Sequence, residues 1–404
     1  MHEFFKQRDK QASLKQRIKL GKRKFPARKR LAAPALSTLA ACLAFNACLI
    51  FNWSALLVGK SWAASNDATW IQVDGETYGA RADKRGPIGG GRGYTGIVTK
   101  GHFVVENLDQ LLETLGKSKV GKVIFIPGNI EIDCTARVYI EQLVLKIPGG
   151  VTLAGNREHK GSKGALIYSD ALKTTRLIRP LGPDVRITGL RIRGPNPKRY
   201  IDHHRRSFAE GRGHKYYYKF PFSRGIEMSH SGLEIDNSEI SGFSHAAIFL
   251  VNGHRHHIHH NFIHHCQYQG LGYGIAHNFA SSLIERNLFD FNRHSIQGTG
   301  ERGGGYEAMN NVELGTSLSH CFDMHGGRDR KDGTDIAGTK ILIHHNTFRA
   351  PNTPIVIRGV PEEMCKVSNN WFPRHANPQK AVRAYENTVV ENNAYGTLPA
   401  RVIE

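Results

Sequence analysis

The sequence lacks long stretches of helical periodicity, and it has few cysteines and few acidic residues. Only six of its 404 residues are cysteine, and 35 aspartates and glutamates stand against 55 lysines and arginines. Because sustained 3.6-residue periodicity is scarce, a helical bundle is not expected, and the core must be built mainly from strands. The length is ample for one large domain or two ordinary ones.

Charged side chains are absent from residues 31–59, and this run is long enough to span a bilayer. Residues 1–30 hold twelve lysines and arginines and two acids. Small residues near Ala63 and Ala64 suit a signal peptidase, and no Arg-Arg pair precedes the run, which argues against a twin-arginine signal. We therefore expect a cytoplasmic basic leader over 1–30 and a signal peptide or inner-membrane anchor over 31–63. The rest of the chain would then be exported to the periplasm or beyond.

The exported part remains basic, because the leader carries only half of the net charge of +20. A basic exported protein suggests an acidic partner, and we expect an acidic polysaccharide. The sequence contains no nucleic-acid-binding module, so nucleic acid is not an expected partner. We expect a monomer that meets the membrane only through its N-terminal segment.

Four cysteines remain in the exported part: Cys134, Cys266, Cys321 and Cys365. In an oxidising compartment they allow up to two disulfides in three connectivities. Buried free thiols are the alternative.

A short template recurs along the second half of the chain. It consists of an aliphatic residue, two free positions, an asparagine, one free position and an aromatic or aliphatic residue. Five of the seven spacings between copies are 23 to 26 residues, and such regularity is typical of a stacked solenoid. Each repeat is too short for a helix pair, so it predicts one coil of a parallel β-helix with asparagines stacked in a tight turn. The copies begin at residues 187, 235, 258, 284, 308, 343, 367 and 390.

Two longer spacings indicate insertions, over residues 195–220 and 326–339. Loops that leave a solenoid on one side often form its binding site.

Upstream of the repeats lie "KVIFIPGNIEIDCT" from Lys122, "LKIPGGVTLAGNRE" from Leu145 and "VRITGLRIRGPN" from Val185. With these phrases the chain resembles the pectate-lyase-like family over about residues 70–396. The resemblance implies an all-β fold, a right-handed single-stranded parallel β-helix, and a carbohydrate-active enzyme. The chain has no clear match to the calcium-binding aspartates and catalytic arginine of the pectate lyases.

The stretch from residue 254 to 265 holds seven histidines in twelve residues. Within it, residues 259–261 (His-His-Asn) occupy the same turn position as residues 344–346 (His-His-Asn) and 285–287 (Glu-Arg-Asn). A position that accepts such different side chains is expected to be partly exposed. We therefore predict exposed histidines stacked around a turn, with a metal site as the alternative.

The strand "HCFDMHGG" from His320 carries the strongest candidate site. Alternation places Phe322 and Met324 toward the core, and Asp323 and His325 side by side on the outer face. A count of twelve residues from successive turn asparagines predicts one column of side chains, about 4.8 Å apart per coil. Its members are Tyr273, Thr299, Asp323 and Arg358.

These residue types suit cleavage of a uronate polymer by β-elimination. Arginines can neutralise the substrate carboxylate so that an enolate is tolerated. A histidine whose tautomer is fixed by a carboxylate can remove the α proton, and a tyrosine can protonate the leaving oxygen. The predicted catalytic residues are His325, Asp323, His294 and Tyr306, and the predicted substrate-binding residues are Arg293, Arg358, Tyr273 and His277.

Other interpretations stay open from the sequence alone. Tyr273 suits a core aromatic, Arg293 a contact between coils, and Asp323 with His325 a structural pair. The same scaffold also suits a glycan-binding protein without catalysis. No metal-ligand set is assigned, and a calcium requirement stays open. A glycoside hydrolase would need two carboxyl groups, and the candidates are Asp290, Glu301, Glu307 and Asp323.

Overall fold

The computed structural model describes residues 68–403, apart from residues 196, 269 and 398–400. The predicted leader and the apolar segment lie outside the described residues. Within the described part, no helix is both long enough and apolar enough to cross a bilayer. The described residues belong to one structural unit that begins at Ala64.

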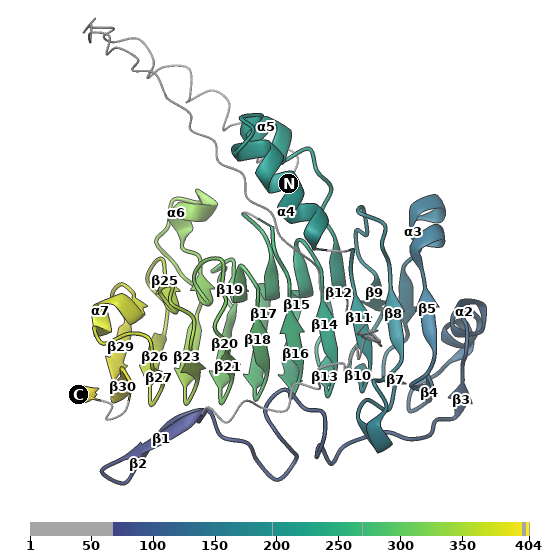
Figure 1. The fold of residues 1–404 in the computed structure, drawn as a ribbon, viewed down its shortest axis with the longest axis horizontal. Helices are drawn as coiled ribbons and strands as arrows, with labels where there is room; N and C mark the ends of the chain where they lie inside the picture. Colours follow the sequence, from purple (N-terminus) through teal and green to yellow (C-terminus); the bar gives the residue numbers. More distant parts are fainter. Residues whose placement is uncertain (1–67, 196, 269, 398–400, 404) are drawn as a thin grey trace, which may run out of the picture. The chain divides into compact units, whose positions relative to one another are not determined.

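The chain winds into a right-handed parallel β-helix with three strands in each full coil (Figure 1). Each strand pairs in parallel with its counterpart one coil later, so the strands form three faces. Two strands, β15 (Ala246–His259) and β17 (Tyr273–Glu285), bend through the corner between the first and the second face. These two faces therefore form one sheet of 18 strands, while the third face is a separate sheet of 11 strands. The all-β solenoid predicted from the repeat is confirmed.

The remaining strands of each face follow the order of the coils. The first face contains β6 (Leu145–Ile147), β9 (Ile178–Pro180), β12 (Arg224–Met228), β19 (His294–Gly298), β22 (Phe322–Met324), β25 (Ile355–Ile357) and β28 (Val382–Arg383). The second contains β3 (Phe103–Val104), β4 (Val123–Phe125), β7 (Thr152–Ala154), β10 (Arg186–Thr188), β13 (Glu234–Asp236), β20 (Gly305–Met309), β23 (Lys340–His344), β26 (Met364–Ser368) and β29 (Thr388–Glu391). The third contains β5 (Glu131–Asp133), β8 (Leu166–Tyr168), β11 (Arg191–Arg193), β14 (Glu239–Ser241), β16 (Phe262–His264), β18 (Leu288–Asp290), β21 (Val312–Glu313), β24 (Thr347–Phe348), β27 (Trp371–Phe372), β30 (Asn393–Tyr395) and the antiparallel β31 (Arg401–Ile403).

A ladder of asparagine side chains builds the corner between the second and the third face. The residue before each ladder asparagine has a left-handed backbone, as Arg286 does at φ 52°, and the chain turns there. The Asn287 side-chain amide donates to the Ile258 carbonyl of the preceding coil at 2.8 Å and to Asn311 Oδ1 of the next at 3.0 Å. The backbone N–H of Asn287 donates to the same Oδ1. The predicted stacking of turn asparagines is thus confirmed, and the ladder runs through Asn261, Asn287, Asn311, Asn346, Asn370 and Asn393.

The interior is filled by rows of aliphatic and aromatic side chains that repeat from coil to coil. On the third face, the rings of Phe348, Phe372 and Tyr395 stack with centroids 5.2 and 5.3 Å apart. Each such ring contributes roughly 1.5–3 kcal/mol through burial. A glutamate interrupts this row of rings. Glu313 is level with Phe289 on the preceding coil and with Phe348 on the following coil. Burial raises the pKa of Glu313 to about 8, although Ser295 opposes the shift.

An N-terminal segment crosses the outside of the coils before the β-helix begins. It starts as an antiparallel hairpin of β1 (Trp70–Val73) and β2 (Glu76–Gly79), where Tyr78 donates to Asn392 Oδ1 at 2.7 Å. Residues 80–96 then run back along the asparagine corner, and we call this segment the strap. Its Gly91 N–H donates to Asn237 Oδ1, and its Tyr94 hydroxyl donates to Asp236 Oδ2 at 2.9 Å.

The strap corrects the prediction that the turn histidines are exposed. His259 and His260 are only 3% and 0% exposed, and Asn261 is fully buried. The Tyr94 ring lies over His260 with centroids 5.2 Å apart, and Asp83 lies 3.4 Å from its Nε2 atom. The template could not reveal this cover, because the covering segment lies far upstream in the sequence.

Both predicted insertions contain helices, which project from the coils in Figure 1. Residues 195–220 form α4 (Lys198–Phe208) and α5 (Gly213–Tyr217), and residues 326–339 begin with α6 (Gly327–Arg330). The other short helices are α2 (Leu108–Lys117), α3 (Thr135–Glu141), η2 (His159–Gly161) and α7 (Pro378–Ala381). The four cysteines of this part are buried free thiols, Cys134, Cys266, Cys321 and Cys365.

Candidate active site on the first face

Asp323 lies at the centre of a polar cluster on the outer side of the first face. Its neighbours in β22, Phe322 and Met324, point into the core, so the predicted alternation is confirmed. Although Asp323 points outward, its side chain is 0% exposed, because surrounding side chains cover it.

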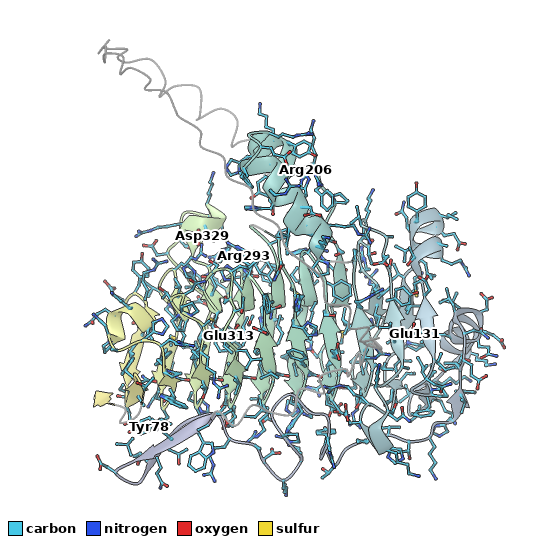
Figure 2. The ribbon with its side chains drawn as sticks, viewed as in Figure 1. Tyr78, Glu131, Arg206, Arg293, Glu313 and Asp329 are labelled. Atoms are coloured by element: carbon cyan, nitrogen blue, oxygen red, sulfur yellow. The ribbon has the colours of Figure 1, made fainter. Side chains whose placement is uncertain are left out.

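Arg358 is the strongest partner of this carboxylate. It follows β25 on the next coil, and its Nε and Nη2 atoms donate to the two Asp323 oxygens at 2.8 and 2.7 Å. Such a bidentate pair has good geometry and neutralises the buried charge. The same guanidinium also lies 3.6 Å from Asp329 in α6, a residue labelled in Figure 2. Arg358 is therefore engaged by protein carboxylates, which does not suit its predicted role as a substrate-binding group.

Three histidines approach the same carboxylate. The Nε2 atom of His325 lies 3.1 Å from Asp323 Oδ2, that of His294 lies 3.4 Å away, and His320 Nδ1 lies 3.6 Å from Oδ1. Burial raises the pKa of Asp323, but His320, His325 and His294 outweigh it and hold the pKa well below its usual range. Burial also lowers the pKa of His294 to about 3, so this ring is neutral in the fold. His294 is fully buried, whereas His325 and His320 are 24% and 22% exposed.

An aromatic row borders the cluster on the preceding coils. The Tyr273 ring stacks on His294 at 5.8 Å, and His294 stacks on His320 at 5.7 Å. The Tyr273 hydroxyl donates to the Gly270 carbonyl at 3.0 Å. Burial raises the pKa of Tyr273, and its contact with Arg293 opposes this shift.

Arg293 contributes a half-buried positive charge to this border (Figure 2). It lies close enough to Tyr273 and His294 to affect their pKa values. Among the described residues, no carboxylate forms an ion pair with Arg293. Its guanidinium therefore remains available for an anionic group from outside the protein.

The predicted column of side chains is wrong in its register. Asp323 is level with Gln297 on the preceding coil and with Val356 on the following coil. The count failed because the number of residues between the turn asparagine and the first-face strand varies from coil to coil. Arg358 reaches Asp323 nevertheless, since its long side chain extends from the residue after β25.

Two other predicted site residues point away from the cluster, into the core. Tyr306 is 3% exposed and belongs to the hydrophobic core, and burial raises its pKa well above the usual value. His277 is 1% exposed and is held by the Gln297 carbonyl and the Ser282 hydroxyl. Neither side chain reaches the outer surface, so neither suits its predicted role in acid catalysis or substrate binding.

His320 is a member of the cluster that the sequence reasoning did not assign. It lies three residues before Asp323, and the spacing His-x-x-Asp-x-His was the available signal. Its contact with Asp323 depends on the bend of the chain just before β22, which alternation along a strand does not describe.

The cluster does not fit a calcium ion. Calcium prefers six to eight oxygen ligands, whereas the donors that converge here are Asp323 and the imidazoles of His294 and His320. Both Asp323 oxygens are already bound by the Arg358 guanidinium, whose positive charge opposes a cation at this point. The arrangement is better suited to moving a proton between a histidine and an anionic ligand.

Comparison with known proteins finds no matching family profile and no matching curated protein. Among solved structures, an alginate lyase from Paenibacillus sp. str. FPU-7 aligns with a TM-score of 0.35 and 10% identity, over 73% of this chain and 98% of that one. A family 28 exopolygalacturonase from Yersinia enterocolitica aligns with a TM-score of 0.40 and 13% identity, over 72% of this chain and 62% of that one. Both likenesses are too distant to transfer a residue role.

Proposed function

We propose that this protein is an exported enzyme that cleaves an acidic, uronate-containing polysaccharide by β-elimination. The observation that carries the proposal is the cluster on the first face, where a histidine–carboxylate pair lies near an arginine without an acidic partner. The outer surface of a β-helix is open along its length, which suits a polymeric substrate.

His325 is the group that best fits the catalytic base. The ionised Asp323 carboxylate can only accept hydrogen bonds, so it favours the His325 tautomer that carries its proton on Nε2. The Nδ1 atom of His325 then has a free lone pair. Arg358 neutralises Asp323 and holds it in place. His294 is buried and neutral, and we assign it a positioning role between Tyr273 and His320.

Arg293 and Tyr273 supply the other two functions that the reaction needs. Arg293 would bind the substrate carboxylate and stabilise negative charge as the base removes the adjacent proton. The electron pair of that C–H bond forms the new double bond, and the bond to the leaving oxygen breaks. Tyr273 would give its proton to that oxygen, because Tyr306 points into the core.

A glycoside hydrolase is the alternative reaction on this scaffold, and the geometry favours it less. A hydrolase needs two carboxyl groups across one bond, one of them with a raised pKa. Asp290 has a raised pKa but belongs to the third face, and Glu307 belongs to the second. Glu301 lies in the loop after β19, 3.6 Å from Arg330. Asp329 shares Arg358 with Asp323. Among the described residues, however, the carboxyl groups with a raised pKa are Asp290 and Glu313, and both belong to the third face.

The test is the ultraviolet absorbance of unsaturated uronate during incubation of the full-length protein with acidic polymers. The panel contains alginate, pectate, glucuronan and glycosaminoglycans, each with and without calcium. We expect absorbance to rise with one polymer, and His325→Ala to lower the rate by about 10²–10⁴-fold. His345→Ala is the matched control, because His345 lies at the asparagine corner and is not part of the cluster.

New reducing ends without absorbance would indicate the hydrolase. Binding without any new chain ends would indicate a glycan-binding protein. A normal rate in His325→Ala would keep the reaction but remove the proposed base.

A further inference from the structure

The second face carries a separate group of histidines and glutamates, between β13 and β17. Glu234 in β13 is level with His257 in β15, and His259 in β15 is level with Glu285 in β17. The Nε2 atom of His259 lies 3.4 Å from Glu234 Oε1. The rings of His257 and His259 lie 4.1 Å apart between centroids.

His259 is held through both of its nitrogens. Its Nδ1 atom lies 2.9 Å from His260 Nδ1, and its Nε2 atom lies 3.4 Å from Glu234 Oε1. The hydrogen bond from His259 lowers the pKa of Glu234, so this carboxylate is charged at neutral pH. A metal ion could replace the proton that His259 Nε2 and Glu234 share, because both atoms then serve as ligands.

The second imidazole has a comparable arrangement. His257 Nε2 lies 2.8 Å from Glu285 Oε1, so it donates to this carboxylate and leaves its Nδ1 with a lone pair. A histidine held by a carboxylate in this way is the usual support of a metal ligand. Glu285 is itself fixed by Arg85 and Arg286, so it orients His257 rigidly.

We propose that Glu234, His257 and His259 bind a divalent transition-metal ion of the zinc type. Each of the three offers a ligand atom, and these atoms lie within 4.8 Å of one another. Two imidazoles and one carboxylate are donors that zinc and its neighbours accept, whereas magnesium and calcium prefer oxygen. The ion would join two coils of the β-helix beside the strap, away from the first face.

The same face contains a natural control that lacks one ligand. Three coils further on, His344 Nε2 lies 3.1 Å from Glu307, and His344 Nδ1 lies 3.0 Å from His345 Nδ1. The position equivalent to His257 is Leu342 there, since the strand register aligns Glu307 with Leu342. This pair has a histidine and a glutamate without a third donor, so it should not retain the ion.

The test is metal binding by the full-length, tag-free protein after treatment with a chelator. Calorimetry with Zn²⁺ should show one tight site, and Co²⁺ should give a visible absorption spectrum of a nitrogen-ligated ion. His257→Leu copies the natural control and should weaken Zn²⁺ binding on the order of 100-fold. Glu234→Gln preserves side-chain shape and should also weaken it, while His344→Leu should leave it unchanged.

Thermal unfolding checks that each variant folds, and saturating Zn²⁺ should raise the melting temperature of the parent but not of His257→Leu. Absence of tight binding would overturn the proposal, as would binding that persists in His257→Leu. In either case, a proton shared by His259 and Glu234 would explain the 3.4 Å distance between His259 Nε2 and Glu234 Oε1.

Discussion

The pKa values of two buried carboxyl groups are shifted in opposite directions by their surroundings. Asp323 is surrounded by Arg358 and three histidines. Although burial raises its pKa, the histidines outweigh burial and hold the pKa well below its usual range. Glu313 lies between two phenylalanines in the interior, and its pKa is raised to about 8 from 4.5. The first group suits chemistry at neutral pH, whereas the second makes folding depend on pH.

We predict that Glu313→Gln stabilises the protein more at pH 8 than at pH 5. Because the folded-state pKa is raised, folding keeps a proton that the unfolded chain releases between pH 4.5 and about 8. Stability is therefore full below pH 4.5 and is lost as pH rises to about 8, by roughly 4–5 kcal/mol in total. Glutamine does not titrate, so thermal unfolding of the variant should lose this pH dependence.

Glu307→Gln is the control on the same coil, because Glu307 lies on the outer side of the second face and pairs with His344. Equal stabilisation by Glu313→Gln at both pH values would show that Glu313 is not protonated in the fold.

At the scale of elements, the strap depends on close contact between its glycines and the asparagine corner. A Cβ atom on Gly90 would lie 2.3 Å from the His260 carbonyl and 2.7 Å from Asn237 Oδ1, and Gly90 has φ +65°. Gly75, in the β1–β2 turn, also has a positive φ of +88°, but nothing lies within 4 Å of its Cβ position. A substitution at Gly75 would therefore cause backbone strain alone, whereas one at Gly90 would cause both backbone strain and a steric clash.

We predict that Gly90→Ala destabilises the protein by about 2 kcal/mol or more, and Gly75→Ala by only about 1 kcal/mol. Denaturant unfolding measures both. Limited proteolysis should cut residues 80–96 faster in Gly90→Ala than in Gly75→Ala. Equal effects of the two substitutions would mean that the strap does not pack tightly on the corner.

The sequence predicts the elements that repeat and misses those that occur once. The asparagine ladder and the inward aliphatic rows were predictable, because each coil carries the same short pattern. Asp323 and His325 were placed correctly, since alternation along one strand is local. The register of Arg358, the inward direction of Tyr306 and the cover over His260 depend on loop lengths and on segments distant in sequence, and the pattern contains no such information.

At the scale of the whole molecule, the excess of positive charge is the main feature relevant to the acidic substrate that we propose. Within the described chain, the first insertion (195–220) holds seven lysines and arginines against two acids, and its helices α4 and α5 project from the coils (Figure 1). This insertion packs next to the loop that precedes Tyr273, because a Cβ on Gly270 would lie 2.6 Å from the Tyr218 hydroxyl. A polymer bound at the candidate site would therefore meet the basic insertion.

We predict that Arg206→Glu in α4, a residue labelled in Figure 2, raises KM for the acidic polymer several-fold and leaves kcat unchanged. The charge of Arg206 would attract the polymer, while its side chain belongs to α4 and not to the cluster around Asp323. The effect should shrink as NaCl rises, because salt screens exposed charges. Steady-state kinetics at two salt concentrations measure this.

Lys122→Glu, at the residue just before β4, makes the same charge change on the first coils and serves as the control. A similar rise in KM in this variant would mean that net charge alone, and not the insertion, attracts the polymer.

The N-terminal hairpin sets an order of assembly along the chain. Tyr78 bonds to Asn392, a residue 314 positions later, so the hairpin cannot reach this partner until the coil that carries Asn392 has been synthesised. The intervening coils can assemble one after another before that contact forms. The hairpin therefore docks after the coils, although it precedes them in the sequence.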